Sequence, residues 1–245
     1  MIIAIPSYRR ANDCITAKYI KSAVIFCHEF EAEDYREHNE NEIVVMSDDL
    51  KGKGMAVIRN EILRLTKDDD VLMMDDDVKY VGFYDKQKLI RMSGDDVVEF
   101  AKSGFRMCKE FGTVLWGLNL QSDKKFYREY SPFSFSSVVL GPFFGIVKNE
   151  KIKFDDSLGL KEDYDYALQV LNKFRKVLRF NKYHYSCAHM DKSGGCANYR
   201  TSKKEQEQAL AFQKKWGSRI VKIDMKTQGG NMSINPVVNS LIKGI

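Results

Sequence analysis

The sequence has few of the features that mark secreted or membrane proteins. Its 5 cysteines are odd in number and include no CxxC pair, which favours reduced thiols in the cytoplasm over a disulfide framework. The longest uncharged stretch, residues 130–147, holds two of only 4 prolines and four serines, so we expect no membrane span. At the N-terminus the apolar run precedes the basic residues, which is the reverse of a secretion signal.

Two nucleotide-binding signatures are also missing. The chain has neither a GxGxxG fingerprint nor a GxxxxGK[ST] loop, which argues against a nicotinamide dehydrogenase and a P-loop NTPase. The rest of the composition, 44% hydrophobic and 30% charged, is that of an ordinary globular protein. A chain of 245 residues is long enough to bury a core of its own. We therefore expect a folded domain, and the motifs below favour an enzyme.

Charge is distributed unevenly along the chain. Residues 1–150 carry a net charge of −4 and residues 151–245 a net charge of +9. A cationic surface attracts phosphate-bearing partners such as nucleic acid, although a solvated lysine-rich surface is the commoner meaning of such an excess. Candidate phosphate contacts are Arg175, Lys176, Arg179, Lys182, Lys203, Lys204, Lys214 and Lys215.

Short β-branched runs alternate with helical patterns, which predicts an α/β fold with a mostly parallel central sheet. The predicted strands cover residues 2–5, 23–27, 43–46, 71–74, 114–118, 143–147 and 177–181. The predicted helices cover a short stretch closing at 18–23, then 55–65, 95–111 with Ser93 or Asp95 as cap, 162–173 and 202–216. No repeat or linker divides the chain, so we predict one domain over residues 1–224 and a tail of uncertain order over 225–245.

The strand predicted at residues 71–74 runs directly into Asp75, Asp76 and Asp77. Three carboxylates cannot enter the core, and ligands of α/β sheets bind outside the carboxyl ends of the strands. Period-two geometry sends Asp75 and Asp77 to one side and Asp76 to the other if the strand continues. Carboxylate oxygens are ligands for hard divalent cations, so the cluster predicts a metal site, with a solvated acidic turn as the alternative.

Two further segments carry candidate chemistry. Gly54 stands before the predicted helix at 55–65 and Arg59 within it, where a close backbone approach and a guanidinium fork suit an anionic ligand. Glu162 and Asp163 open the helix at 162–173, where they either complement the helix dipole or act as a general base. His189 could complete a cation's coordination or be an ordinary core histidine, and its spacing from neighbouring His and Cys residues fits no common zinc signature.

The order of these motifs resembles that of GT-A glycosyltransferases, which have a Rossmann-like fold with helices on both sides of the sheet. The resemblance follows Ile3 to Arg9, Gly52 to Gly54 with Arg59, the three aspartates, Glu162-Asp163 and His189, over about residues 1–220. The segments 141–145, 160–166 and 194–200 are similar to phage-type TET-associated glycosyltransferases. That family is implicated in sugar modification of hydroxymethylated pyrimidines in DNA.

The resemblance implies a site and a reaction. Pro6, Ser7, Tyr8 and Arg9 would line the nucleobase and ribose pocket, Gly54 and Arg59 would lie near the diphosphate, and Asp75 and Asp76 would contact the nucleotide. Asp75, Asp77 and His189 would hold Mn²⁺ or Mg²⁺, and Asp163 would be the base, with Glu162 able to exchange roles with it. The implied activity is hexose transfer from a UDP-sugar to 5-hydroxymethylcytosine or 5-hydroxymethyluracil in DNA, with inversion. The implied location is the cytoplasm, that of the host if the protein is phage-encoded.

Other functions fit parts of the same sequence. The same chemistry could act on a glycan, protein or lipid acceptor, although the second half of the chain is basic rather than apolar. A non-catalytic nucleic-acid-binding protein would use the basic half and leave the acidic clusters structural. Paired aspartates also hold the cations of metal-dependent nucleases and nucleotidyltransferases.

Overall fold

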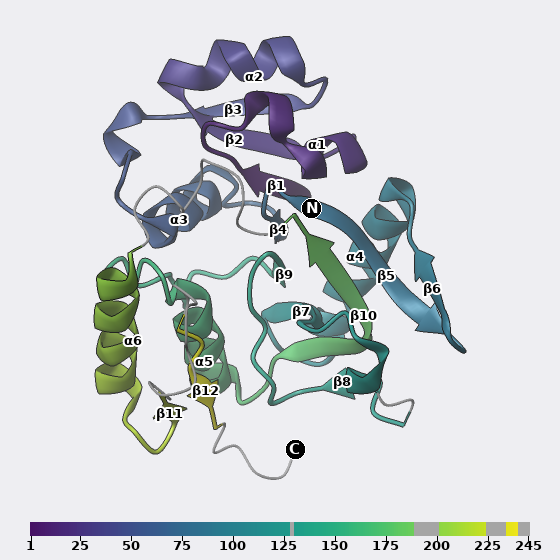
Figure 1. The fold of residues 1–245 in the computed structure, drawn as a ribbon, viewed down its shortest axis with the longest axis vertical. Coiled ribbons are helices and arrows are strands. Elements are labelled where there is room, and N and C mark those ends of the chain that lie inside the picture. The colour runs from purple at the N-terminus through teal and green to yellow at the C-terminus, as the bar shows by residue number, and fades with distance from the viewer. Residues whose placement is uncertain (128–129, 189–200, 224–233, 240–245) are drawn as a thin grey trace.

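The computed structural model describes residues 1–127, 130–188, 201–223 and 234–239, and it centres on one large sheet (Figure 1). The strand order is β3-β2-β1-β4-β9-β7-β10-β5-β6, with β8 pairing β10. The strands are β1 (Ile2–Pro6), β2 (Val24–His28), β3 (Glu42–Met46), β4 (Val71–Met74), β5 (Val78–Asp85), β6 (Lys88–Arg91), β7 (Leu115–Asn119), β8 (Phe133–Ser134), β9 (Phe143–Ile146) and β10 (Leu178–Cys187). A separate small ladder joins β11 (Val221–Lys222) to β12 (Val237–Val238).

The sheet is mostly parallel by strand direction but mixed in its pairing. β3, β2, β1 and β4 are parallel neighbours, and β7 is parallel to β10. β9 runs the opposite way between β4 and β7, while β5 and β6 extend the far edge as an antiparallel hairpin. Because β1 pairs with β2 on one side and β4 on the other, the chain reverses its strand order there, which is where ligands of α/β sheets bind.

Helices cover both faces of the sheet, as predicted. They are α1 (Ile15–Tyr19), α2 (Ala32–His38), α3 (Met55–Leu65), α4 (Gly94–Glu110), α5 (Glu162–Phe174) and α6 (Ser202–Trp216). One core packs α1, α2 and α4 against residues such as Ile5 and Leu72, and the other packs α3, α5 and α6 against alternate residues such as Ala4 and Met73. This alternation follows from the period-two geometry of strands buried on both sides. None of the described helices has the length and apolarity needed to cross a membrane.

Several predicted boundaries need correction. The first helix ends at Tyr19 instead of continuing to residue 23, and residues 20–23 turn into β2. Ser93, not Asp95, caps α4, because its hydroxyl accepts from the Asp96 backbone N–H in a capping box. β10 continues to Cys187, six residues beyond the predicted end. The β5–β6 hairpin and α2 were not predicted. The domain boundary at residue 224 stays a prediction.

Two glycines around β9 make room for large side chains. A Cβ atom on Gly145 would lie 1.9 Å from Nε1 of Trp116, and one on Gly141 would lie 2.9 Å from Nη2 of Arg59. Trp116 is completely buried and is surrounded by Phe100, Phe105 and Phe143. The indole therefore has no room to move away from a larger residue at position 145.

We predict that Gly145→Ala lowers the free energy of unfolding by about 1–3 kcal/mol, because the added methyl group overpacks the core. Urea unfolding followed by tryptophan fluorescence measures the change. Gly159→Ala is the matched control, because a Cβ there would meet only the Cα of Gly54, at 3.8 Å. Equal stability of wild type and Gly145→Ala would contradict the packing described for Trp116.

Candidate active site

The first part of the site is the loop after β1, which is tied to the end of β4. The Ser7 hydroxyl donates to Oδ2 of Asp76 over 2.7 Å, and the Arg10 guanidinium pairs with Oδ1 of the same carboxylate. Tyr35 donates to Ser7 over 2.6 Å, and Glu31 accepts from the Arg9 backbone N–H, also over 2.6 Å. Asp76 is only 5% exposed, so its carboxylate serves as an anchor for this loop. Its contact with a nucleotide stays a prediction.

The loop presents a group of aromatic rings at the carboxyl ends of β1 and β2. The Tyr8 ring meets His28 and Phe30 edge-on, with centroids 5.6 and 6.0 Å apart, and His28 stacks on Phe30. Two cations flank the group: the Arg9 guanidinium lies 5.2 Å from the Tyr8 ring and Lys51 Nζ lies 4.5 Å from the Phe30 ring. Phe30 is 47% exposed, so its ring is accessible from solvent. We call Tyr8, His28 and Phe30 the aromatic platform.

The second part of the site is a buried arginine between two carboxylates. Arg59, on α3, is 3% exposed and lies against the rings of Phe144 and Phe154. Its Nη1 is 2.9 Å from Oε1 of Glu162, at the start of α5, and its Nη2 is 3.5 Å from Oδ1 of Asp75, after β4. Arg59 therefore fixes these two carboxylates relative to each other, which sequence spacing could not indicate. Its predicted contact with a diphosphate stays a prediction.

Asp163 differs from its neighbour Glu162 in its surroundings. Glu162 is 7% exposed and paired, whereas Asp163 is partly exposed. The Asp163 carboxylate accepts from the backbone N–H of Gly141 over 3.2 Å and from that of Tyr164 over 2.8 Å. The Tyr185 hydroxyl, from β10, donates to the Gly141 carbonyl oxygen over 3.1 Å. Asp163 is thus held in place at the surface, and only Glu162 is shielded from solvent.

These carboxylates share one negatively charged region. Burial raises the pKa of Asp75 to about 6, opposed by Arg59 and reinforced by Asp77, Asp76 and Asp163. Even so, 41% of the Asp75 side chain reaches solvent, so the group is surrounded by protein yet accessible. Burial and the Arg59–Glu162 contact act in opposite directions on the pKa of Glu162, and burial prevails, so its pKa is raised.

Asp75 and Asp77, two of the three expected metal ligands, have side chains that suit a divalent cation. Asp75 and Asp77 are partly exposed, but β4 ends at Met74, so the alternation expected of a continuing strand does not apply. The expectation that none of the three carboxylates enters the core is wrong for Asp76, which is buried because Ser7 and Arg10 pair with it. Asp75 and Asp77 offer hard oxygen donors whose mutual repulsion a cation would relieve. Among the described residues no three His, Cys, Asp or Glu side chains form a metal-binding group. His189 lies outside the described residues.

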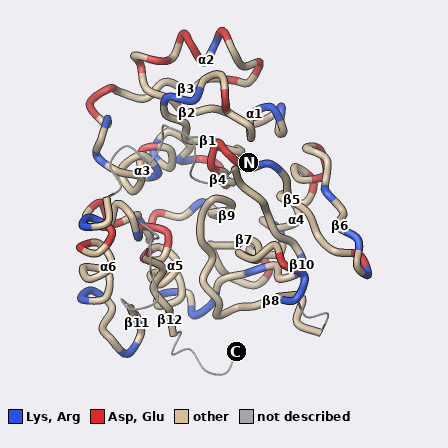
Figure 2. The backbone as a smooth tube through the Cα atoms, viewed as in Figure 1, with Lys and Arg blue, Asp and Glu red and all other residues tan. Residues whose placement is uncertain are grey.

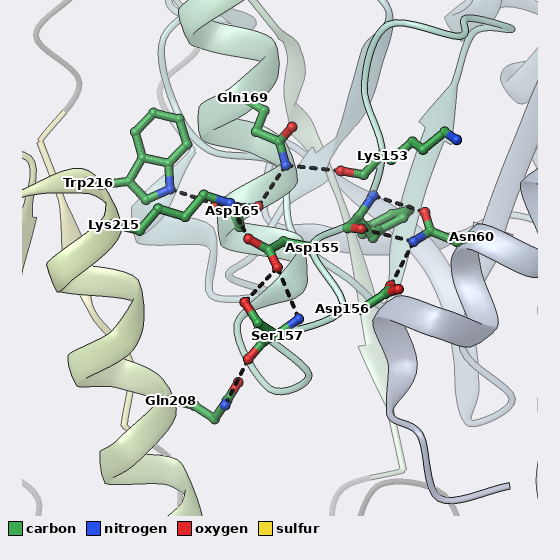
Figure 3. A network of polar contacts seen from close by, with 11 residues as sticks. Asn60, Lys153, Asp155, Asp156, Ser157, Asp165, Gln169, Gln208, Lys215 and Trp216 are labelled. Carbon is green, nitrogen blue, oxygen red and sulfur yellow. Dashed lines mark hydrogen bonds and ion pairs between the residues drawn. The ribbon is translucent and has the colours of Figure 1, made fainter. Parts of the chain in front are cut away.

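A polar network fastens the start of α5 to its surroundings (Figure 3). Asp165, completely buried, accepts from Trp216 Nε1 over 2.7 Å and pairs with Lys215 at 2.8 Å, both on α6. Lys215 also reaches Asp155 at 2.6 Å. On the other side, Asn60 of α3 donates to the Phe154 carbonyl oxygen over 2.9 Å. The network holds α5 against α6, and α3 against the segment that precedes α5.

Sequence reasoning missed several members of the site. His28 is the last residue of β2 and Phe30 follows it, so the rule about carboxyl ends of parallel strands could have found them. Tyr185 lies on the part of β10 that was not predicted, and burial raises its pKa well above the usual value. Gly54, predicted at the diphosphate, begins α3 with a φ of 95° and lies against Gly159.

We predict that Arg59→Met lowers the free energy of unfolding by about 3–5 kcal/mol, because it leaves Glu162 buried without its cation. In Arg59→Met/Glu162→Gln the uncompensated charge is gone, so the double variant should lose less than Arg59→Met alone. Urea unfolding of the wild type, both single variants and the double variant at neutral pH completes the cycle. Additive losses would show that Arg59 and Glu162 are not coupled.

We predict that Asp75→Asn stabilises the metal-free protein above about pH 6. Folding raises the Asp75 pKa to about 6, so between pH 4 and 6 the folded state keeps a proton that the unfolded state releases, and stability falls as pH rises. The gain at higher pH should be about 1 kcal/mol, because solvent screens a side chain that is 41% exposed. The two proteins should converge near pH 4.

Thermal unfolding in EDTA from about pH 4 to 8 measures this difference. Asp49→Asn, which removes an exposed carboxylate from the turn after β3, is the control. A loss of stability in Asp75→Asn, or a difference independent of pH, would contradict the crowding of charge around Asp75.

Comparison with known proteins identifies the family of the chain. A family model described as TET-Associated Glycosyltransferase matches residues 1–195. No curated protein matches the chain. The matched residues contain the loop after β1, the three aspartates and the Glu162-Asp163 pair, together with the α/β sheet that supports them. Because the match covers about four-fifths of the 245 residues, the chain belongs to the TET-associated glycosyltransferase family and is a glycosyltransferase.

Proposed function

We propose that this enzyme transfers a hexose from a UDP-sugar to the hydroxymethyl group of a 5-hydroxymethylpyrimidine in DNA, with inversion and with help from a divalent cation. The observation that carries the proposal is that Asp75, after β4, and Asp163, in the first turn of α5, are both partly exposed and close enough for their charges to interact. A transferase needs one set of carboxylates for the leaving group and a separate one for the acceptor proton. The family supports an acceptor among modified DNA bases.

The aromatic platform is the proposed site for the donor's nucleobase. An accessible ring such as Phe30 offers a face on which a base can stack. Arg9 and Lys51 lie beside the platform, where they can pair with the diphosphate. Anchoring of the loop by Asp76 and Tyr35 keeps this surface in place before the donor binds, which reduces the entropy cost of binding.

Asp75 and Asp77, with His189, are the proposed ligands of Mn²⁺ or Mg²⁺. When bound, the cation stabilises the negative charge that develops on the departing diphosphate. Asp75 is suited to this task because it is accessible and because burial, together with neighbouring carboxylates, raises its pKa, an effect that a cation would offset. Arg59 keeps the Asp75 carboxylate oriented in the absence of ligand.

Asp163 is the proposed general base, and Glu162 is a positioning residue. The Asp163 carboxylate is held by two backbone N–H groups and keeps free lone pairs with which to accept a proton from the acceptor hydroxyl. Glu162 is buried against Arg59 and cannot reach an acceptor from that position. Attack by the deprotonated hydroxyl on the face opposite the diphosphate is a single displacement and inverts the anomeric configuration.

We predict that Asp163→Asn lowers the transfer rate by about 10²- to 10⁴-fold and leaves donor affinity within about twofold, because only the proton acceptor is lost. The assay incubates enzyme, Mn²⁺, a panel of nucleotide sugars and DNA containing cytosine, 5-hydroxymethylcytosine or 5-hydroxymethyluracil, and follows mass shifts of the digested nucleosides. Glu150→Gln, which changes an exposed carboxylate outside the candidate active site, is the matched control. NMR of the product should show the anomer opposite to that of the donor.

Each alternative has its own outcome in this assay. Unmodified hydroxymethyl bases with every donor would reject the DNA acceptor, and sugar found on a glycan, protein or lipid would replace it. Strand cleavage or nucleotide turnover would indicate a nuclease or nucleotidyltransferase. DNA binding without donor binding would indicate a non-catalytic binder. Full activity of Asp163→Asn would reject the assignment of the base.

A further inference from the structure

The β5–β6 hairpin carries a row of exposed cations that sequence reasoning did not single out. Lys79, Lys86, Lys88 and Arg91 are all exposed, and Asp85 is the single acidic residue between them. Within the described part of the chain none of these four cations forms an ion pair. Figure 2 shows the blue segments along this hairpin. Charge on the hairpin is therefore available to an external anion.

The hairpin begins at the active site. β5 starts at Val78, directly after Asp77, and the end of β10 returns to the same place, where the Ala188 N–H donates to the Asp77 carbonyl oxygen over 2.9 Å. Lys79 lies close enough to Cys187 to oppose the rise in the pKa of that thiol. From here the 8 residues of β5 extend away over about 25 Å at the usual rise per residue.

More cations lie at the far end and along the neighbouring strand. Lys124 donates to the Gln87 side chain over 2.6 Å and Tyr84 donates to the Ser122 carbonyl oxygen over 3.1 Å, so the short helix η4 (Lys124–Phe126) lies against the hairpin tip. On β10, Lys182 Nζ lies 4.9 Å from the Phe83 ring. The cations thus lie along the hairpin from Asp77 to its tip, and in the strand register Lys88, opposite Asp85, and Arg91, opposite Gly82, fall on its two faces. We call this set of residues the hairpin strip: Lys79, Lys86, Lys88, Arg91, Lys124 and Lys182.

We propose that the hairpin strip is the docking surface for the phosphate backbone of duplex DNA, and this rests on the proposed function. Successive phosphates of one strand rise by about 3.4 Å along the duplex axis, so a strip of about 25 Å matches the length of about seven base-pair steps. Docking there leads the duplex toward Asp75 and Asp163 at one end of the strip. Among the described residues no ion pair joins Lys79, Lys86, Lys88 or Arg91 to a carboxylate, whereas on α6 Lys215 is paired with Asp155 and Asp165.

The β5–β6 hairpin and α6 lie on opposite sides of the molecule in Figure 1, so variants in each can distinguish between the two as DNA-binding surfaces. β6 is also an edge strand, and lysines on edge strands prevent pairing with other sheets. If edge protection is their only role, removing them promotes aggregation without changing affinity for DNA. If they bind phosphates, removing them weakens binding and reduces its salt dependence.

The test compares two triple variants with the same loss of charge. Lys86→Gln/Lys88→Gln/Arg91→Gln removes three cations from the strip, and Lys203→Gln/Lys214→Gln/Arg219→Gln removes three exposed cations on and after α6. Fluorescence anisotropy with a labelled duplex of about 20 base pairs gives the dissociation constant between ~50 and ~200 mM salt. Thermal unfolding checks that both variants are folded.

We expect the strip variant to bind DNA at least about tenfold more weakly at low salt, with a salt slope smaller by about 2.7, and the α6 variant to stay within about twofold of wild type. Equal losses in both variants, a larger loss in the α6 variant, or unchanged affinity with increased aggregation of the strip variant would overturn the proposal.

A second measurement separates this proposal from the proposed function. With hydroxymethylated DNA as acceptor, the strip variant should show a higher KM for duplex, an unchanged kcat and an unchanged KM for the donor. If the wild type transfers no sugar to DNA, the proposed function fails, yet the anisotropy comparison still decides whether the strip binds duplex. If transfer occurs and the strip variant keeps the wild-type KM for duplex, only the docking surface is wrong.

Discussion

The candidate active site depends on the burial of one guanidinium between two carboxylates. Arg59 is removed from water by α3, Phe144 and Phe154, and a buried cation is costly unless it is paired. Its partners come from two separate parts of the chain: Asp75 follows β4, and Glu162 begins α5. The requirement to satisfy Arg59 therefore fixes the distance between the strand end and the helix start. Asp163, the next residue on α5, is positioned by the same constraint.

This arrangement concentrates negative charge where ordinary folding would disperse it. The pKa of Asp75 is raised mainly by burial and further by neighbouring carboxylates, against the opposing effect of Arg59, so the charged form of Asp75 is disfavoured there. The surrounding structure compensates through the Asp165 network and the buried pair of Lys161 and Glu205, 2.7 Å apart. A site that binds a cation or takes up a proton is expected to combine carboxylates of raised pKa with surrounding side chains that hold them in place.

The sequence predicted the strands from β3 to β7 in the sheet order, and only the first part of β10. Residues 55–65 and 202–216 form the helices that were expected, because both have clear apolar periodicity and a glycine or threonine at the helix start. The β5–β6 hairpin escaped notice because its turn contains Lys86, at a φ of 53°, instead of the glycine or asparagine that marks such turns. The predicted range of β10 ends too early because polar residues alternate with packed ones over residues 182–187.

The sequence predicts those parts of the site that lie at the ends of neighbouring parallel strands. It does not predict the parts that depend on contacts between side chains far apart in the sequence. Ser7 to Arg9 and the three aspartates meet because β1 and β4 are parallel neighbours. Arg59 and Glu162 are 103 residues apart, so no local pattern could indicate that they pair or that Asp163 is thereby the more exposed acid. The hydrogen bond from the Gly141 N–H to Asp163 also joins residues far apart in the sequence, so no local pattern predicts it. The sequence pointed to residues 141–145 only through their resemblance to a family.

The most direct test of the account is anomalous diffraction from crystals soaked with Mn²⁺ and UDP. The account predicts a manganese peak beside the Asp75 and Asp77 carboxylates, with the diphosphate next to it and the uracil ring on Tyr8, His28 or Phe30. A diphosphate bound elsewhere, with Asp75 still turned toward Arg59 and no manganese beside the three aspartates, would contradict it.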